Sequence, residues 1–187
     1  AARNERRDAS FKFGTNPCSE IILRPYQFCN LSEVVVREDD TLQTLKKKVR
    51  TATILGTLQA TMTDFRYLRN IWKKNTEEEA LLGVSMTGIM DCKLTNGSTG
   101  EAALGRLLET LRDVAVETNK EWANKLGINQ SAAITCVKPS GTVSQLTDSA
   151  SGIHPRFSEY YIRTVRADKK DPLATAMIDA GFPHEED

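Results

Sequence analysis

The sequence has no excess of charge of either sign and no long apolar run. Lys plus Arg number 25 and Asp plus Glu number 25, so the formal net charge is zero. A balanced charge offers no general attraction for nucleic-acid phosphates or acidic lipids, and we expect neither nucleic acid nor membrane as a partner. No apolar stretch approaches the roughly 18 residues that a membrane helix needs, and charges occupy the N-terminus where a signal peptide has its apolar region. We therefore expect a soluble, cytoplasmic protein.

Cysteine and histidine are both scarce, with 4 and 2 residues. Cys18, Cys29, Cys92 and Cys136 are irregularly spaced, which matches neither a dense disulfide framework nor the paired Cys-x-x-Cys of a zinc site. We expect no metal site. In a reducing compartment, a pair among these cysteines is more typical of catalysis than of structure.

The chain also lacks repeats, low-complexity tracts and any linker long enough to separate domains. Its 187 residues, of which 40% are hydrophobic, suffice for one core of ordinary composition. It begins without Met and stops soon after a helix-like segment that closes at Gly181, so we expect a piece of a longer protein. Residues 1–187 are expected to form one partial domain.

Short strand-like runs alternate with helical patterns. The runs lie at 20–23, 31–36, 84–86, 132–137 and 160–166. Helices are predicted at 40–68 with Asp40 as its cap, from Ser98 towards residue 122 with a capping box to Glu101, and at 171–181. This alternation favours an α/β fold with parallel strands and crossover helices.

The stretch at 14–23 carries the most chemical information. Gly14 and Pro17 exclude a regular helix, which predicts a loop that leads into a strand. Because alternate side chains of extended backbone share a face, Asn16, Cys18 and Glu20 are expected to converge. An amide, a thiol and a carboxylate together supply a hydrogen-bonding group, a hydrogen-atom or nucleophilic centre, and a general base.

Taken alone, the same residues also fit a non-catalytic interpretation, in which Cys18 is buried and Glu20 is a surface residue of the same turn. A cysteine protease or thiol transferase would pair the thiol with a histidine, and His154 and His184 are far away in sequence, although such partners can meet in space.

A second motif, at 138–145, follows the strand-like run 132–137. Ser140, Gly141, Thr142, Val143 and Ser144 form a glycine-containing turn with three hydroxyls, which can offer backbone N–H groups and side-chain donors to an anion. The pattern alone describes an ordinary capped turn equally well.

Three charged residues flank this turn. Lys138 would add positive charge to an anion site. His154 and Arg156 either line that site or fix the turn after it, and the structural role is favoured.

Both motifs resemble one enzyme family. Asn16-Pro17-Cys18-x-Glu20-Ile21 resembles the finger-loop signature of ribonucleotide reductases, and 136–146 with 151–156 resembles their monomeric, adenosylcobalamin-dependent, triphosphate-reducing branch. The similarity runs from near Phe13 to 168–172. Ser19 departs from the glycine common in the family, and we expect this small residue to preserve the loop. The resemblance implies the later portion of a ten-stranded α/β barrel with a central finger loop, here 14–23.

The resemblance implies a role for each matched residue. Cys18 corresponds to the cysteine that becomes a thiyl radical and takes the hydrogen atom from C3′ of the ribose. Glu20 corresponds to the carboxylate that accepts the 3′-hydroxyl proton, and Asn16 to the amide that binds the ribose hydroxyls. Cys29 matches one member of the redox pair, whose partner lies upstream of this chain. Residues 140–144 would bind the substrate phosphates.

The resemblance also implies a ribonucleoside triphosphate substrate, adenosylcobalamin as cofactor, and thioredoxin or a similar dithiol as reductant. A deoxynucleotide effector would bind outside this chain, and the protein would be a monomer. Cys92 and Cys136 are expected to be buried thiols without a role. Two alternatives remain: a sister reductase with another radical source or diphosphate substrates, and a non-catalytic nucleotide-binding fragment in which Cys18 and Cys29 are merely buried.

Overall fold

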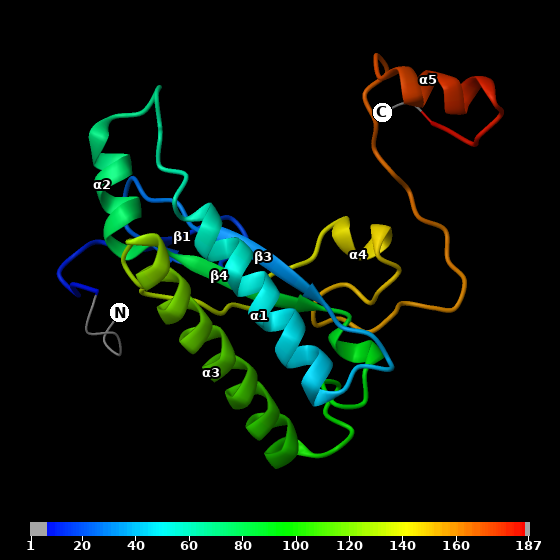
Figure 1. The fold of residues 1–187 in the computed structure, drawn as a ribbon. Helices are drawn as coiled ribbons and strands as arrows, with labels where there is room; N and C mark the ends of the chain where they lie inside the picture. Colours follow the sequence, from blue (N-terminus) through cyan, green and yellow to red (C-terminus); the bar gives the residue numbers. More distant parts are fainter. Residues whose placement is uncertain (1–6, 186–187) are drawn as a thin grey trace. The chain divides into compact units, whose positions relative to one another are not determined.

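The computed structural model describes residues 7–185, which fall into two units (Figure 1). The first unit ends at Arg156 and the second begins at Phe157. The second unit contains one helix, α5 (Pro172–Asp179), which begins as the sequence predicts: the carboxylate of Asp171 accepts a hydrogen bond from the N–H of Leu173 at 2.9 Å. No helix among the described residues is both long enough and apolar enough to span a bilayer.

Two parallel strands form the centre of the first unit. β3 (Asn30–Val35) pairs with β4 (Leu82–Thr87), with Asn30 opposite Leu82 and Val35 opposite Thr87. The chain between them forms α1 (Leu42–Gln59) and α2 (Asn70–Glu79). Because parallel strands need such a crossover, the order of elements and the pairing agree, and the predicted α/β fold with parallel strands is confirmed.

The predicted strand at 132–137 is reduced to a single parallel bridge between Val84 and Thr135. Backbone hydrogen bonds still hold this segment along β4: the N–H of Val84 donates to the carbonyl of Ile134 at 2.8 Å, and that of Cys136 donates to the carbonyl of Val84 at 3.1 Å. The segment therefore runs as an irregular third strand on the other side of β4 from β3.

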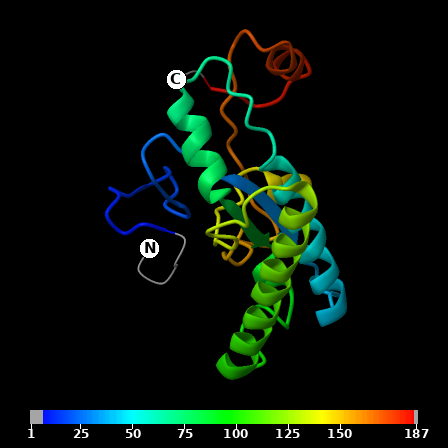
Figure 2. The ribbon, with the colours of Figure 1, turned by 60° about the vertical axis from the view of Figure 1, so that its left-hand side comes forward.

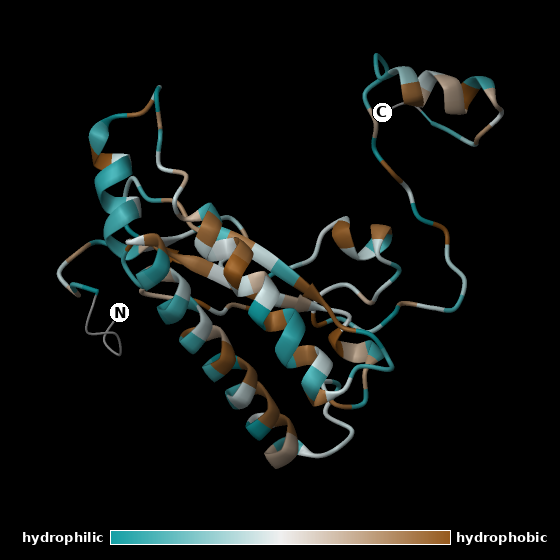
Figure 3. Ribbon diagram, viewed as in Figure 1, coloured by the Kyte–Doolittle hydropathy of each residue, from teal (hydrophilic) through white to brown (hydrophobic). Residues whose placement is uncertain are grey.

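One face of this sheet, called here the helix face, is covered by α1 and α3 (Glu101–Leu126), which lie side by side in both ribbon views (Figures 1 and 2). Its core contains strand residues together with residues of both helices: Val34, Val36, Leu82, Val84, Leu45, Val49, Leu111 and Ala115. Figure 3 shows hydrophobic and hydrophilic residues alternating along α1 and α3, as expected of helices buried on one side.

The opposite face, called here the loop face, receives the N-terminal segment. Ile21, Leu81 and Ala132 form a small buried cluster, against which Leu23, Cys29, Leu31, Ala133 and Cys136 pack. Gly83 lies at its centre: a Cβ there would lie 2.9 Å from Cδ1 of Ile21 and 3.1 Å from Sγ of Cys136. A larger residue at Gly83 would therefore force the side chains of Ile21 and Cys136 to move away from the sheet.

The N-terminal segment forms an antiparallel hairpin from β1 (Gly14–Thr15) and β2 (Ile22–Leu23). A buried carboxylate anchors it. Glu79, 1% exposed, receives bonds from Arg7 at 3.0 and 2.8 Å and from Gln27 at 2.6 Å. Arg7 also donates to the carbonyl of Ile22 at 2.9 Å. The hairpin is thereby fixed to the end of α2, directly before β4.

The helix predicted at 40–68 is wrong at both ends. Its cap is Thr41, whose hydroxyl accepts from the N–H of Thr44, while Asp40 accepts instead from Lys48 at 2.6 Å. The helix stops at Gln59, where the hydroxyl of Thr61 bonds the carbonyl of Leu58 at 2.7 Å. Threonine side chains compete for backbone groups in this way. The apolar residues that continue the helical spacing after Gln59, up to residue 68, therefore lie in a loop.

Two further local predictions fail, and one helix was missed. α3 begins at Glu101 without a side-chain cap, because the hydroxyl of Ser98 donates to the carbonyl of Lys93 at 3.2 Å. Residues 160–166 form no strand. α2 was not predicted, because most of its residues are hydrophilic and give no clear apolar stripe.

Replacing Glu79 with Gln should lower the free energy of unfolding by about 3 kcal/mol, because Arg7 would remain buried without a counter-charge. Urea denaturation of the chain measures this. Glu117→Gln, which removes an exposed carboxylate from α3, is the matched control and should change stability by less than about 0.5 kcal/mol. Equal effects of the two substitutions would contradict the anchoring role.

The contribution of Glu79 should also depend on pH. Burial acts to raise the pKa of Glu79, but the hydrogen bonds from Arg7 and Gln27 and the charges of Arg7 and Arg24 outweigh it and hold the pKa below the ordinary value of 4.5. A lowered folded-state pKa means that the stabilisation is fully present above pH 4.5 and is lost as the pH falls through the folded value. The stability difference between wild type and Glu79→Gln should therefore narrow on acidification; a constant difference would refute this linkage.

Candidate active site

The tip of the hairpin is a turn stabilised by Asn16. The side-chain oxygen of Asn16 accepts from the N–H of Ile21 at 3.0 Å, and its backbone N–H donates to the carbonyl of Ile21 at 3.3 Å. The N–H of Ser19 donates to the carbonyl of Asn16 at 2.9 Å. The side chain of Asn16 is thus oriented by its own loop.

Ser19 has a φ of 62°, in the left-handed region that glycine adopts most readily. The turn therefore imposes a glycine-like conformation at the position where the sequence departs from the glycine common in reductases. A small side chain fits this conformation at a cost of about 1 kcal/mol.

Cys18 lies at the tip of the turn and is exposed. Residues 17 and 18 form a turn rather than extended backbone, so the alternation that predicted convergence of Asn16, Cys18 and Glu20 does not apply here. Within residues 7–185, no hydrogen bond joins the thiol of Cys18 to Asn16 or Glu20. Glu20 is half-buried, and its Oε2 has no hydrogen-bond partner among the described residues.

Glu20 and Cys29, which are predicted site residues, do come together on the loop face. Burial, and then the charge of Glu20, raise the pKa of the Cys29 thiol. Burial followed by the charges of Glu20 and Cys29 raises the pKa of Cys136 to about 11. Both thiols are therefore neutral at pH 7, a state suited to donating hydrogen atoms rather than to nucleophilic attack.

Cys136 was expected to be a buried thiol without a role, and nothing in the sequence placed it near the other candidate residues, but the structure brings it close to them. The bridge at Thr135 places Cys136 opposite β4, on the face that also holds Cys29 and Glu20. No sequence pattern indicated that Cys136 lies near Cys29 and Glu20, because the residues of an irregular strand do not reveal its register. Cys92, in contrast, is 1% exposed in the helix-face core, as expected of a buried thiol.

The loop at 138–145 leads into the short helix α4 (Val143–Leu146). The hydroxyl of Ser140 accepts from the N–H of Ser144 at 3.0 Å, and the hydroxyl of Ser144 donates to the carbonyl of Gly141 at 3.3 Å. Ser140 and Ser144 are buried, whereas Gly141, Thr142 and Val143 are exposed. The two serines therefore support the loop from inside, and the three residues between them form its surface.

A carboxylate from β3 meets this loop. Glu33 accepts a hydrogen bond at Oε2 from the hydroxyl of Ser140 at 3.3 Å. Sequence reasoning missed Glu33. The available signal was its position four residues after Cys29, which places both side chains on the same face of a strand.

Arg156 fixes the turn behind the loop. Its guanidinium binds the carboxylate of Asp91 through Nε at 3.0 Å and that of Asp148 through Nη1 at 3.0 Å. Hydrogen bonds to these two carboxylates raise the pKa of Arg156. His154 is exposed, and its backbone N–H donates to the carbonyl of Ser151 at 2.9 Å. These contacts favour the structural role for Arg156.

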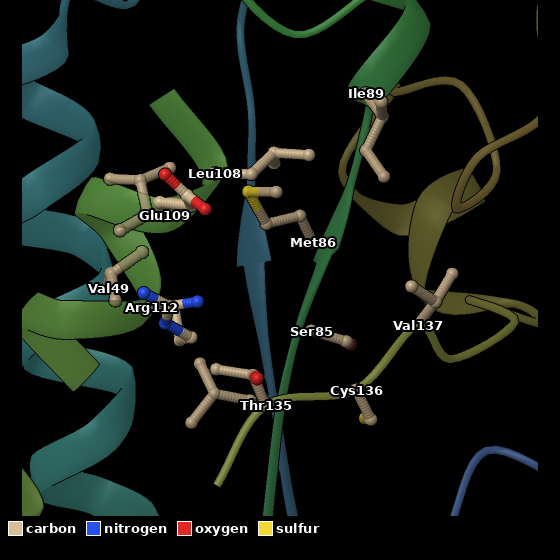
Figure 4. Close-up of a pocket in the computed structure, with 12 residues that line it drawn as sticks. Val49, Ser85, Met86, Ile89, Leu108, Glu109, Arg112, Thr135, Cys136 and Val137 are labelled. Atoms are coloured by element: carbon tan, nitrogen blue, oxygen red, sulfur yellow. The ribbon is translucent and has the colours of Figure 1, made fainter. Parts of the chain in front are cut away.

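A cavity of about 380 Å³ lies between α3 and the edge of the sheet (Figure 4). Leu108, Glu109 and Arg112 line it on the helix side, and Cys136 and Val137 line it on the other side. None of residues 14–23 or 140–144 contributes to its wall. The cavity is therefore separate from most of the candidate catalytic groups.

Comparison with known proteins finds relatives of this sequence. No family model matches the chain. An adenosylcobalamin-dependent ribonucleoside-triphosphate reductase of Lactobacillus gasseri is 31% identical over 203 residues, which cover 93% of this chain and 26% of the relative. A protein of Dictyostelium discoideum named as a probable enzyme of the same kind is 31% identical over 182 residues, covering 90% of this chain and 22% of the relative.

A solved structure agrees with these relatives. The crystal structure of a B-12 dependent (class II) ribonucleotide reductase matches with a TM-score of 0.63 and 26% identity, over 93% of this chain and 27% of that chain. The fold is thus part of the class II reductase fold, as the motifs predict. By sequence and by structure, this chain is a homologue of the adenosylcobalamin-dependent ribonucleoside-triphosphate reductases, over a segment that makes up 26% of the length of the Lactobacillus gasseri enzyme.

Proposed function

We propose that the full-length protein containing this chain reduces ribonucleoside triphosphates to 2′-deoxyribonucleoside triphosphates. Residues 1–187 are then part of the catalytic barrel, with a finger loop at 14–23 and a phosphate loop at 138–145. The observation that carries the proposal is the loop face, where Glu20, Cys29 and the support of the phosphate loop lie on one side of a parallel sheet. The names of the relatives support triphosphates over diphosphates as substrate.

Each finger-loop residue has a defined task in this reaction. Cys18, as a thiyl radical, takes the hydrogen atom from C3′ of the ribose. Glu20 accepts the proton of the 3′-hydroxyl at Oε2, the oxygen that has no partner among residues 7–185. Asn16 orients the ribose hydroxyls, and the hydrogen bond from Ile21 sets the direction of its side chain.

Reduction at C2′ needs two electrons in addition to the radical. Cys29 and a cysteine outside this chain supply them as a dithiol, the 2′-hydroxyl leaves as water, and the two sulfurs end as a disulfide. The raised pKa of Cys29, caused by burial and then by Glu20, keeps its hydrogen on sulfur until it is needed. Thioredoxin or a similar dithiol then reduces the disulfide. This chain alone lacks one member of the pair and does not complete a turnover.

The phosphate loop holds the triphosphate through its exposed part. Gly141, Thr142 and Val143 face solvent, and Ser140 and Ser144 hold their backbone in place from below. Lys138 contributes positive charge beside this surface. Neutral donors on a fixed backbone suit an anion because they need no rearrangement on binding.

Adenosylcobalamin is the proposed source of the radical, and it supplies radical chemistry when bound. The exposed thiol of Cys18 at the tip of the turn fits this source, because a bound group must reach the sulfur from outside this chain. We further propose a cytoplasmic monomer with its deoxynucleotide effector bound elsewhere. The four cysteines are free thiols, as is usual in a reducing compartment.

Substituting Cys18 with Ala in the full-length protein should abolish deoxynucleotide formation, because no other sulfur occupies the tip of the finger loop. Wild type should turn over repeatedly on the triphosphate only with both adenosylcobalamin and a dithiol present. Ser19→Gly is the matched control and should retain activity, since glycine adopts a φ of 62° without strain. Product from Cys18→Ala would reject the radical role, and product from diphosphate alone would assign the protein to the sister branch.

Replacing Glu20 with Gln should reduce kcat by about 10²- to 10⁴-fold, the range for loss of a general base, while KM for the nucleotide changes little. Steady-state kinetics on the full-length protein give both constants. Glu38→Gln removes an exposed carboxylate near β3 and serves as the control. A rise in KM at constant kcat would show that Glu20 binds substrate but does not move the proton.

A further inference from the structure

Glu33 occupies a position between the thiols and the phosphate loop. It lies on β3, opposite Ser85 of β4. Side chains two apart on a strand share a face, so Cys29, Leu31 and Glu33 all belong to the loop face. Cys29 and Leu31 pack in the cluster around Ile21, and Glu33 extends beyond them to the loop at 138–145.

A chain of hydrogen bonds runs from Glu33 into the loop. Oε2 of Glu33 accepts from the hydroxyl of Ser140, and the same hydroxyl accepts from the N–H of Ser144 at 3.0 Å. Ser140 is 4% exposed and Ser144 is fully buried. The hydroxyl of Ser140 is therefore engaged on both sides, which makes it a support of the loop rather than a free donor to phosphate.

The other carboxyl oxygen has no such partner. Oε1 of Glu33 is buried without a hydrogen bond among the described residues. Burial raises the pKa of Glu33, while the hydrogen bond from Ser140 and the charge of Lys138 oppose the rise. Among the described residues, Glu33 interacts electrostatically with Lys138 and with the thiol of Cys136. Cys136 also interacts with the charge of Glu20. An ionised carboxylate here would repel an anion held by the adjoining loop.

We propose that Glu33 is a positioning residue of the nucleotide site, which fixes the phosphate loop through Ser140 and favours nucleotide binding when its carboxyl carries a proton. The proposal rests on the proposed function of the loop at 138–145. It deepens that function in one respect: binding of a nucleoside triphosphate takes up a proton at Glu33, so affinity falls as the pH rises. The protonated carboxyl still accepts from Ser140, so the support is kept while the charge is removed.

Two substitutions separate the support from the charge. Glu33→Gln keeps an oxygen acceptor for Ser140 and removes the charge, whereas Glu33→Ala removes both. In the full-length protein, Glu33→Ala should raise KM for the ribonucleoside triphosphate about tenfold, the equivalent of one hydrogen bond to a charged group, with kcat changed much less. Glu33→Gln should bind at least as tightly as wild type and should lose the pH dependence of KM. Glu38→Ala, an exposed carboxylate beyond the end of β3, is the matched control.

A double substitution tests the path through Ser140. Ser140→Ala should raise KM as Glu33→Ala does, and the double variant should be no worse than either single one, because both remove the same support. Unchanged KM in Glu33→Ala, a loss confined to kcat, or a pH profile of Glu33→Gln identical to that of wild type would each overturn the proposal. Additive effects of the two single substitutions would also overturn it.

Equilibrium binding keeps this inference separate from the proposed function. In a Cys18→Ala background, which does not turn over, binding of the ribonucleoside triphosphate is measured with and without Glu33→Ala. Binding that Glu33→Ala weakens supports the inference. Binding that Glu33→Ala leaves unchanged overturns the role of Glu33 alone, and no binding to the Cys18→Ala protein overturns both this inference and the proposed phosphate loop.

Discussion

The candidate site depends on the hydrogen bonds and ion pair that the buried carboxylate of Glu79 makes with Arg7 and Gln27. Glu79 ends α2 and directly precedes β4, and its bonds from Arg7 and Gln27 hold the N-terminal hairpin against the sheet. A buried charge is tolerated only with such partners, and here the partners come from the segment that must be positioned. The proposed finger loop therefore has a fixed base at Glu79, while its tip, with Cys18, is exposed. This division fits the proposed radical role of Cys18, whose sulfur would have to meet groups from outside the chain.

The second constraint on the site is the parallel pair β3 and β4, which separates the apolar core on the helix face from the candidate residues on the loop face. Side chains directed to the helix face form the apolar core with α1 and α3, and those directed to the loop face include Cys29 and Glu33. Gly83 lets the hairpin pack closely enough for Ile21 to reach the sheet. Residues that alternate along β3 thus contribute to the apolar core on one face and to the proposed site on the other.

The sequence predicted the relatives and the fold class of this chain better than its local geometry. The motifs around Cys18 and Ser140 resemble those of the reductases that the comparisons found, and the α/β alternation predicts the parallel strands. The convergence of Asn16, Cys18 and Glu20 within one extended loop does not follow, because Ser19 adopts a positive φ and turns the chain. Neither the place of Cys136 nor the bond from Ser140 to Glu33 was predictable, since both depend on contacts across more than 100 residues of sequence. Such contacts are set by strand register, which motifs and periodicity do not specify.

The central claim is that the loop face holds a reductase site in which Cys29 provides electrons. The most direct measurement is to trap free thiols and map disulfides by mass spectrometry, after the pre-reduced full-length protein has reacted with a ribonucleoside triphosphate and adenosylcobalamin without external dithiol. The account predicts one disulfide per deoxynucleotide formed, joining Cys29 to a cysteine outside this chain, with Cys92 and Cys136 still free. A deoxynucleotide formed while Cys29 remains a free thiol would contradict the account.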